Sequence, residues 1–180
     1  TNISWTLDAD GVLTVSGTGN MKGSTYPEPE NDWSGWDHLR DSIRQVVITE
    51  GVATIGNEAF RDCPNLTGVS FPNSIMWIRD SAFARCNALT TITIPKSVKS
   101  LGHFAFSDCS SLKSISFEEG FQSYGMGAFD GCASLMSLTF PKTVTDIYDL
   151  TFDNCKSLKS IYFCGKAPYV WESASPSSAS

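Results

Sequence analysis

A constant interval of 23 residues separates five of the six cysteines. Other columns keep the same interval, because a phenylalanine stands three residues before each of these cysteines and a leucine three residues after it. Such a short period predicts a repeat protein whose units bury their apolar edges only by stacking on one another. The three columns are Cys63, Cys86, Cys109, Cys132 and Cys155; Phe60, Phe83, Phe106, Phe129 and Phe152; and Leu66, Leu89, Leu112, Leu135 and Leu158.

One unit reads Cys-x-x-Leu-x-x-Ile-x-Phe-Pro-x-x-Val-x-x-Ile-Gly-x-x-Ala-Phe-x-x. Its Leu-x-x-Ile-x-Phe segment has the alternation of a short strand with one buried face, and Pro72, Pro95 and Pro141 end that strand. The spacing of Ala-Phe-x-x-Cys-x-x-Leu predicts one inward-facing turn of helix or 3-10 helix. Each unit therefore predicts one coil, with a strand on one side and an irregular return on the other.

The fold class that follows is an α/β repeat, a right-handed solenoid of 23-residue coils with a parallel sheet on one side. Parallel strands about 4.8 Å apart give five such coils a core roughly 20–25 Å long. We expect the array at 36–163, as a half-coil over 36–48 and then the five coils marked by the cysteines. Residues 164–180 are an extension or linker, in which Tyr169, Val170 and Trp171 either fold back as a minimal cap or precede further chain.

The first 35 residues have the features of a cap for the open end of this solenoid, which would otherwise expose sheet edges. The segments 3–7 and 13–16 alternate, and Asp10-Gly11 between them is a hairpin turn signal. We therefore predict an N-terminal β-hairpin over the first coil, with an aromatic-rich loop over 26–36 packed on it. Arg40 stands where the repeat has a cysteine, so we expect the outer side of the half-coil to face the cap or solvent.

The chain resembles the BspA-like (treponemal-type) leucine-rich repeats of bacterial surface proteins. The resemblance rests on the recurring Ile-Gly-x-x-Ala-Phe-x-x-Cys-x-x-Leu-x-x-Ile-x-Phe-Pro pattern, as at 55–72, and on the lead-in at 5–19. It implies a leucine-rich-repeat solenoid, export to the cell surface and binding of host proteins or other cells, with no catalytic motif to transfer. The departures are Arg79 and Tyr148 in the glycine column, Thr151 in the alanine column, and Glu118 and Cys164 in the proline column.

Charge and composition exclude several classes of function. The net charge of −6 and pI near 4.8 disfavour a nucleic-acid partner, which calls for a basic surface. No segment has the roughly 20 consecutive apolar residues that insertion into a membrane requires. His38 and His103, the only histidines, fall about three coils apart and without an evident partner, so we expect no enzyme, no cofactor and no metal site.

The cysteine column itself invites two readings, a metal site or disulfides. Metal sites use ligands two to four residues apart, whereas a 23-residue interval stacks the thiols in a line. Disulfides between neighbouring coils satisfy the distance but not the torsion near 90° that the bond prefers, because the side chains run parallel. We therefore expect buried free thiols that pack as small apolar residues, and Cys164, outside the column, as the reactive thiol.

The residues between the inward columns of each strand point outward and are mostly small hydroxyl residues. Serine and threonine tolerate an exposed sheet face without any function, which is the alternative interpretation. As a binding face, this flat and uncharged surface suits a protein or a glycan better than an enclosed small molecule. Trp77 on the return side is a further candidate contact, as an exposed aromatic in a polar column. The candidate face is Val47, Ser70, Thr91, Thr93, Ser114, Ser116, Ser137, Thr139 and Tyr162.

These observations predict a non-enzymatic, secreted or surface-bound bacterial module that binds a host or cell-surface protein or glycan. The alternative is a structural spacer that positions a neighbouring domain of a larger surface protein. Neither reading determines the oligomeric state.

The inside–outside assignment of the strands predicts unequal effects for two neighbouring substitutions. Leu112→Ala is expected to lower the free energy of unfolding by about 2–5 kcal/mol, because it leaves a cavity in the central coil. Ser114→Ala is expected to change the free energy of unfolding very little. Urea denaturation of both variants measures the difference, and equal effects would show that the assignment is wrong.

Overall fold

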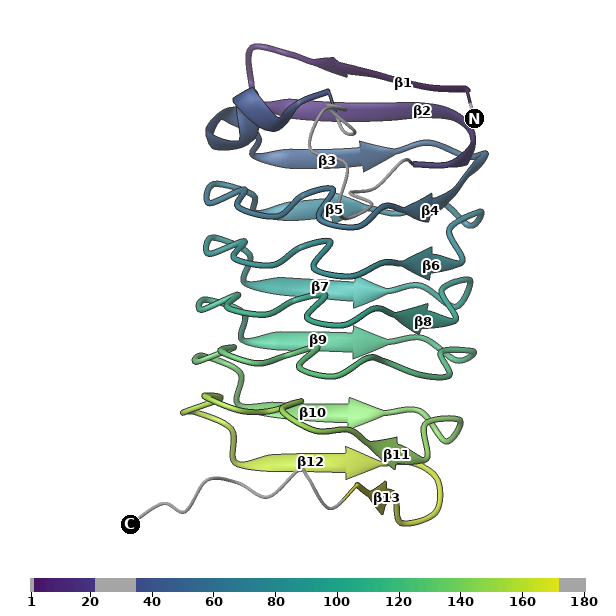
Figure 1. Cartoon of the computed structure of the whole chain (residues 1–180), viewed down its shortest axis with the longest axis vertical. Helices are drawn as coiled ribbons and strands as arrows, with labels where there is room; N and C mark the ends of the chain where they lie inside the picture. Colours follow the sequence, from purple (N-terminus) through teal and green to yellow (C-terminus); the bar gives the residue numbers. More distant parts are fainter. Residues whose placement is uncertain (1, 22–34, 172–180) are drawn as a thin grey trace.

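The computed structural model describes residues 2–21 and 35–171, which wind into a stack of coils along one long axis (Figure 1). Neighbouring coils are offset by 23 residues, so that, for example, Thr91 pairs with Ser114. The apolar columns of the repeat run through the middle of the stack as one continuous core. The prediction of a parallel-sheet solenoid with an N-terminal hairpin is therefore confirmed.

The hairpin consists of β1 (Asn2–Leu7) and β2 (Val12–Asn20), which pair in antiparallel register. Asp8 Oδ1 accepts the backbone N–H groups of Asp10 and Val12 at 3.0 and 2.9 Å, and Gly11 takes the left-handed conformation that closes the turn. β2 also pairs in parallel with the first coil, so the hairpin continues the sheet and its other strand covers the edge. Residues 26–34 of the expected aromatic loop lie outside the described residues.

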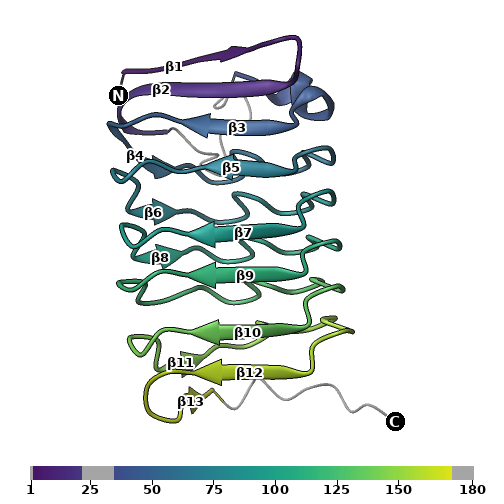
Figure 2. The same ribbon diagram turned by 180° about the vertical axis from the view of Figure 1, so that it is seen from behind.

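The first ladder of parallel strands carries the predicted strand of every coil (Figure 2). Hydrogen-bonded pairing joins β2, β3 and β5, then β7 to β9, and β10 to β12. Its members after β2 are β3 (Gln45–Ile48), β5 (Gly68–Ser70), β7 (Thr91–Ile94), β9 (Ser114–Phe117), β10 (Ser137–Phe140) and β12 (Ser160–Phe163).

The return side carries a second ladder, so the prediction of an irregular return was wrong. Most of these strands have only two residues, too few for an alternation to be recognised in the sequence. In β6 and β8, Ile78 and Leu101 enter the core, and the two strands pair with each other in parallel. The members are β4 (Val52–Ile55), β6 (Trp77–Ile78), β8 (Ser100–Leu101), β11 (Asp146–Ile147) and β13 (Tyr169–Val170), with an isolated bridge at Ser123.

A third side of each coil consists of turns, which we name the turn walls: residues 57–63, 80–86, 103–109, 126–132 and 149–155. Among the described residues the one helix is the 3-10 helix η1 (Asp37–Ser42), before the first wall. Three alternate N–H groups of each of the first four walls donate to carbonyls of the wall in the next coil, all in the same direction. At the first junction the bonds run from Glu58 to Asp80, from Phe60 to Ala82 and from Asp62 to Ala84, at 2.8–2.9 Å.

Each turn wall contains two residues in the left-handed region, which prevent it from winding into a helix. In the first wall these are Glu58 and Asp62, with φ of 56° and 54°; in the fourth they are Gly127 and Gly131. A non-glycine residue in this conformation costs roughly 1–2 kcal/mol. The hydrogen bonds between coils offset that cost.

Aromatic and sulfur columns line the core beside the turn walls. Trp36 and the five phenylalanines of the repeat form one stack, with neighbouring ring centroids 5.2–6.4 Å apart. The thiol of Cys109 donates to the carbonyl of Phe83 at 3.1 Å, and those of Cys86, Cys132 and Cys155 make the equivalent bond. The cysteine is thus the small residue that fills its column and also satisfies a buried carbonyl.

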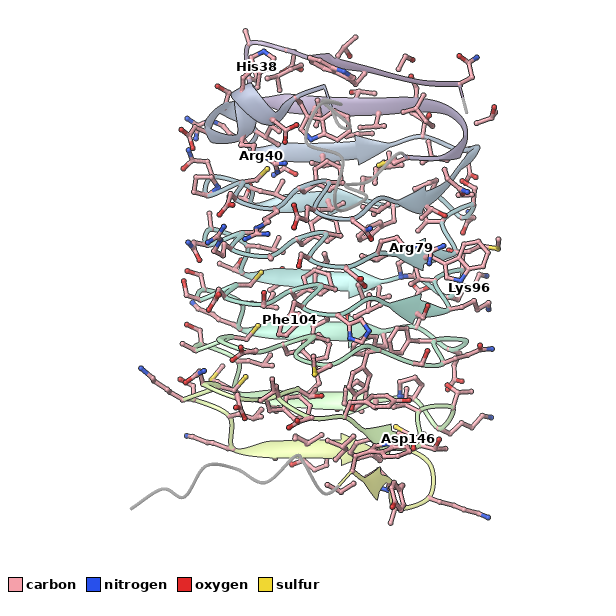
Figure 3. The ribbon with its side chains drawn as sticks, viewed as in Figure 1. His38, Arg40, Arg79, Lys96, Phe104 and Asp146 are labelled. Atoms are coloured by element: carbon pink, nitrogen blue, oxygen red, sulfur yellow. The ribbon has the colours of Figure 1, made fainter. Side chains whose placement is uncertain are left out.

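The turn wall of the first coil has no preceding wall to supply N–H groups to its carbonyls. Trp36 Nε1 donates to Ala59 O at 2.8 Å, and the Arg40 guanidinium donates to Arg61 O and, at 3.3 Å, to Glu58 O. Arg40 also pairs with Asp37, and both residues belong to η1 near the hairpin end of the stack (Figure 3). Its place in the cysteine column therefore has a structural reason, the capping of backbone acceptors.

The opposite end of the stack is less enclosed. The final coil's Phe152, Leu158 and Ile161 are only partly buried, and β13 exposes Tyr169 and Val170 to 61% and 50%. Trp171 stacks on Tyr148 with the ring centroids 6.3 Å apart. Residues 169–170 thus extend the second ladder by pairing with β11.

The role of Arg40 can be tested by substitution. Arg40→Met is expected to lower the free energy of unfolding by about 1–3 kcal/mol, because carbonyls of the first wall lose their donors. Asp37→Asn removes the charge of the partly buried ion pair but keeps the Arg40 donors, and it is expected to cost less. Urea denaturation measures both, and equal losses would contradict the capping role.

Candidate binding surface

The structure places the strand-face candidates on the outer side of the first ladder. All are exposed except Val47, which is half-buried, and Tyr162 at the far end is 59% exposed. The strand residues between them, such as Ile92 and Ile115, are buried, as the alternation requires. We name Val47, Ser70, Thr91, Thr93, Ser114, Ser116, Ser137, Thr139 and Tyr162 the hydroxyl face.

Two hydroxyls at the centre of this face bond to one another across neighbouring strands, Thr93 Oγ1 to Ser116 Oγ at 2.9 Å. A hydroxyl both donates and accepts, so each can turn toward a ligand when one is present. The face carries no charged side chain of its own. It is therefore suited to hydrogen bonding and to close approach by a flat partner.

The hydroxyl face extends onto the hairpin, which the sequence reasoning missed. Thr14 of β2 lies in register with Val47, and Thr6 of β1 lies in register with Thr14. Two pairs along the hairpin, Ser4 Oγ and Ser16 Oγ lie 3.0 Å apart. Alternating hydroxyl residues in both hairpin segments indicate this extension, but the sequence prediction assigns the hairpin only a capping role.

Trp77 is half-buried, so the expectation of a freely exposed aromatic at this position was wrong. It lies on β6 of the second ladder, and the Arg79 guanidinium stands 5.8 Å from its ring centroid. That distance is within the range of a cation–π contact, which shields one ring face. Its neighbour Met76 is the more exposed side chain, at 38%.

The two histidines lie in different parts of the structure. His38 is exposed on η1, at the hairpin end of the stack (Figure 3). The ring of His103 is held against the next coil, where its Nδ1 accepts the backbone N–H of Met126 at 3.1 Å. In the part of the chain that the structure describes, no group of three or more His, Cys, Asp or Glu side chains could hold a metal ion.

All six cysteines are free thiols, and they differ in burial. Four are buried, Cys155 is partly buried and Cys164 is exposed. Burial disfavours the charged thiolate, so it raises the pKa of Cys63 and of Cys109 from 9.0 to about 12 and that of Cys155 to about 11. Burial also raises the pKa of Cys86 and Cys132 well above 9.0. These protonated thiols are poor nucleophiles and serve the core.

Comparisons with known proteins agree with this geometry. A family model described as "BspA type Leucine rich repeat region" matches residues 38–164 in six copies. A search of curated proteins finds no match to the sequence. Among the described residues, no helix has the length and apolar character needed to cross a membrane.

Several solved structures share the fold. A leucine-rich repeat protein of T. pallidum (TpLRR) has a TM-score of 0.71 and 23% identity, over 93% of this chain and 83% of that one. The pneumococcal vaccine antigen PcpA has a TM-score of 0.57 and 17% identity, over 96% and 48%. A leucine-rich repeat protein from Bacteroides ovatus has a TM-score of 0.55 and 23% identity, over 91% and 52%.

The buried thiols predict a loss of stability in alkali. Their pKa is higher in the folded chain than in the unfolded chain, so above about pH 9 the unfolded state binds fewer protons and the free energy of unfolding falls with pH. Each such thiol adds about 1.4 kcal/mol per pH unit to this slope.

Urea denaturation between about pH 8.5 and pH 10.5 measures the slope. Cys109→Ala is expected to make it shallower by one thiol's contribution, whatever its effect on stability at neutral pH. Ser114→Ala, which removes no titrating group, serves as the control. A slope that Cys109→Ala leaves unchanged would contradict the assignment.

Proposed function

Because the chain belongs to the BspA-type leucine-rich-repeat family, we propose that it is an exported bacterial module that binds a protein or glycan on a host or neighbouring cell. Such binding requires no catalytic residues. Leucine-rich-repeat solenoids are in general non-enzymatic recognition proteins. One structurally similar protein, PcpA, is a vaccine antigen, which favours a location on the cell surface.

The observation that carries the proposal is the hydroxyl face. Stacking of identical coils brings Thr93 and Ser116, among others, into one plane of exposed hydroxyls beside a rigid core. Docking of a partner there costs this protein little conformational entropy, since the strands are already ordered. The half-buried Val47 and the exposed Tyr162 supply apolar contact near the two ends, where aromatic side chains often anchor a partner.

The same rigid stack also fits a spacer that holds a neighbouring domain at a distance. A spacer needs the ladders but not the hydroxyls, so substitutions on the hydroxyl face separate the two functions.

The test replaces Thr93 and Ser116 with arginine and measures binding to a panel of host matrix proteins and cell-surface glycans by surface plasmon resonance. Two bulky charges at the centre of a flat face are expected to weaken binding at least tenfold. Both residues are exposed, so the fold is expected to be retained, which circular dichroism checks.

A matched control places arginine at Ser110, an exposed residue outside the hydroxyl face. Unchanged binding by Thr93→Arg and Ser116→Arg would eliminate this face as the site. A parent protein that binds nothing in the panel would favour the spacer.

A further inference from the structure

A shallow groove with a volume of about 390 Å³ lies on the second ladder, away from the hydroxyl face. Its polar lining comes from three successive coils and consists of Asp80, Ser100, His103 and Ser123. Tyr148, from the next coil, stands at its end. Arg79 and Asp146, which belong to the first and the last of these coils, mark this side of the stack in Figure 3.

The glycine column of the repeat forms the floor of the groove. A Cβ atom at Gly102 would lie 2.3 Å from Asp80 Oδ1, and one at Gly125 would lie 2.6 Å from the backbone nitrogen of His103. A side chain at either position would run into the preceding coil, so glycine lets these coils stack closely, and backbone lines the groove there. In the next coil the glycine column carries Tyr148, whose side chain lines the end of the groove.

Backbone hydrogen bonds hold the polar groups in fixed orientations. Asp80 Oδ1 accepts the His103 N–H at 2.8 Å, and His103 Nδ1 accepts the Met126 N–H at 3.1 Å. A neutral imidazole that accepts at Nδ1 carries its proton on Nε2, which makes Nε2–H a donor. Among the described residues, Asp80 Oδ2 and the hydroxyls of Ser100 and Ser123 have no hydrogen-bond partner.

We propose that this groove binds a neutral saccharide, with one pyranose unit over the glycine floor. A fixed donor beside a fixed acceptor and two hydroxyls complements sugar hydroxyls, which donate and accept at once. Trp171 stacks on the Tyr148 ring and Tyr124 stands perpendicular to it, so Tyr148 bounds the end of the groove with an apolar contact for the C–H groups of the pyranose. The Asp80 carboxylate repels an anion, and the His103 Nε2–H is a donor that a sugar hydroxyl can use and a cation cannot.

This site lies beyond the proposed function, because it uses a different side of the coils and none of the residues of the hydroxyl face. The two can therefore fail separately. Loss of saccharide binding leaves the strand-face partner untouched, and the reverse also holds.

The experiment follows backbone amide chemical shifts by NMR while the parent protein is titrated with glucose, galactose, mannose and N-acetylglucosamine. The amides of His103, Gly125 and Met126 are expected to shift with at least one of these sugars. A single pyranose in so open a site is expected to bind with a Kd of about 1 mM.

Two variants remove ligand contacts but keep the bonds between coils. Asn57, in the same column as Asp80 and His103, accepts the Asp80 N–H through its own Oδ1, so asparagine is compatible with this position. His103→Asn removes the Nε2–H donor, and Asp80→Asn exchanges the free carboxylate oxygen for an amide. Each is expected to weaken saccharide binding about tenfold. Thr93→Arg, on the hydroxyl face, is the control and is expected to leave it unchanged.

Three results would overturn the proposal. The first is the absence of shifts with every sugar at about 20 mM, well above the expected Kd. The second is a set of shifts that maps to residues outside the groove. The third is tighter binding of arginine or lysine than of any sugar, which would make the groove a site for cationic side chains instead.

Discussion

In this protein the turn walls bond to one another in one direction only, and the rest of the architecture depends on that direction. Each wall between the two ends donates N–H groups toward the C-terminal end of the stack and accepts from the wall before it. A coil therefore has all its backbone groups satisfied only when it lies between two other coils, which makes equal coil length a requirement.

The single direction of these hydrogen bonds also makes the two ends of the stack different. The first wall presents carbonyls, and Trp36 and Arg40 supply their donors. Among the described residues, the N–H groups of Phe152 and Asn154 in the last wall have no such acceptor.

The stacking that consumes the interior also determines where recognition can occur. The cysteine, phenylalanine and leucine columns are buried in the core, and the turn walls form hydrogen bonds with one another. The outer side of the first ladder and the second ladder remain. Because every coil has the same length, each column repeats one chemistry, so the hydroxyl face is uniform from Ser70 to Thr139 and departs from this chemistry only at Val47 and Tyr162. A local site then requires a departure from the repeat, and Tyr148, at the end of the glycine floor, is such a departure.

The sulfur column shows how one residue type can serve both packing and hydrogen bonding. Cys86, Cys109 and Cys132 fill a narrow position and donate to carbonyls of the preceding coil. Serine would also donate, but it would bury a more polar group, and alanine would leave the carbonyl without a donor. The raised thiol pKa values follow from the same burial. A column that resembles a metal or redox motif in spacing alone is thus part of the core.

The sequence by itself determined the period, the inward columns and the strand face, because each coil repeats the same side-chain pattern and Thr93 or Ile92 can be assigned by alternation alone. It also indicated the hairpin, through Asp10-Gly11. Only the tertiary structure decided the direction of the turn walls, the second ladder, the cap by Arg40 and the groove over Gly102 and Gly125. Those features depend on backbone groups and on residues 23 positions apart. Glu58 and Phe104 adopt the left-handed conformation although neither is glycine, so their residue types do not predict it. A strand of two residues is too short to show an alternation of apolar and polar residues.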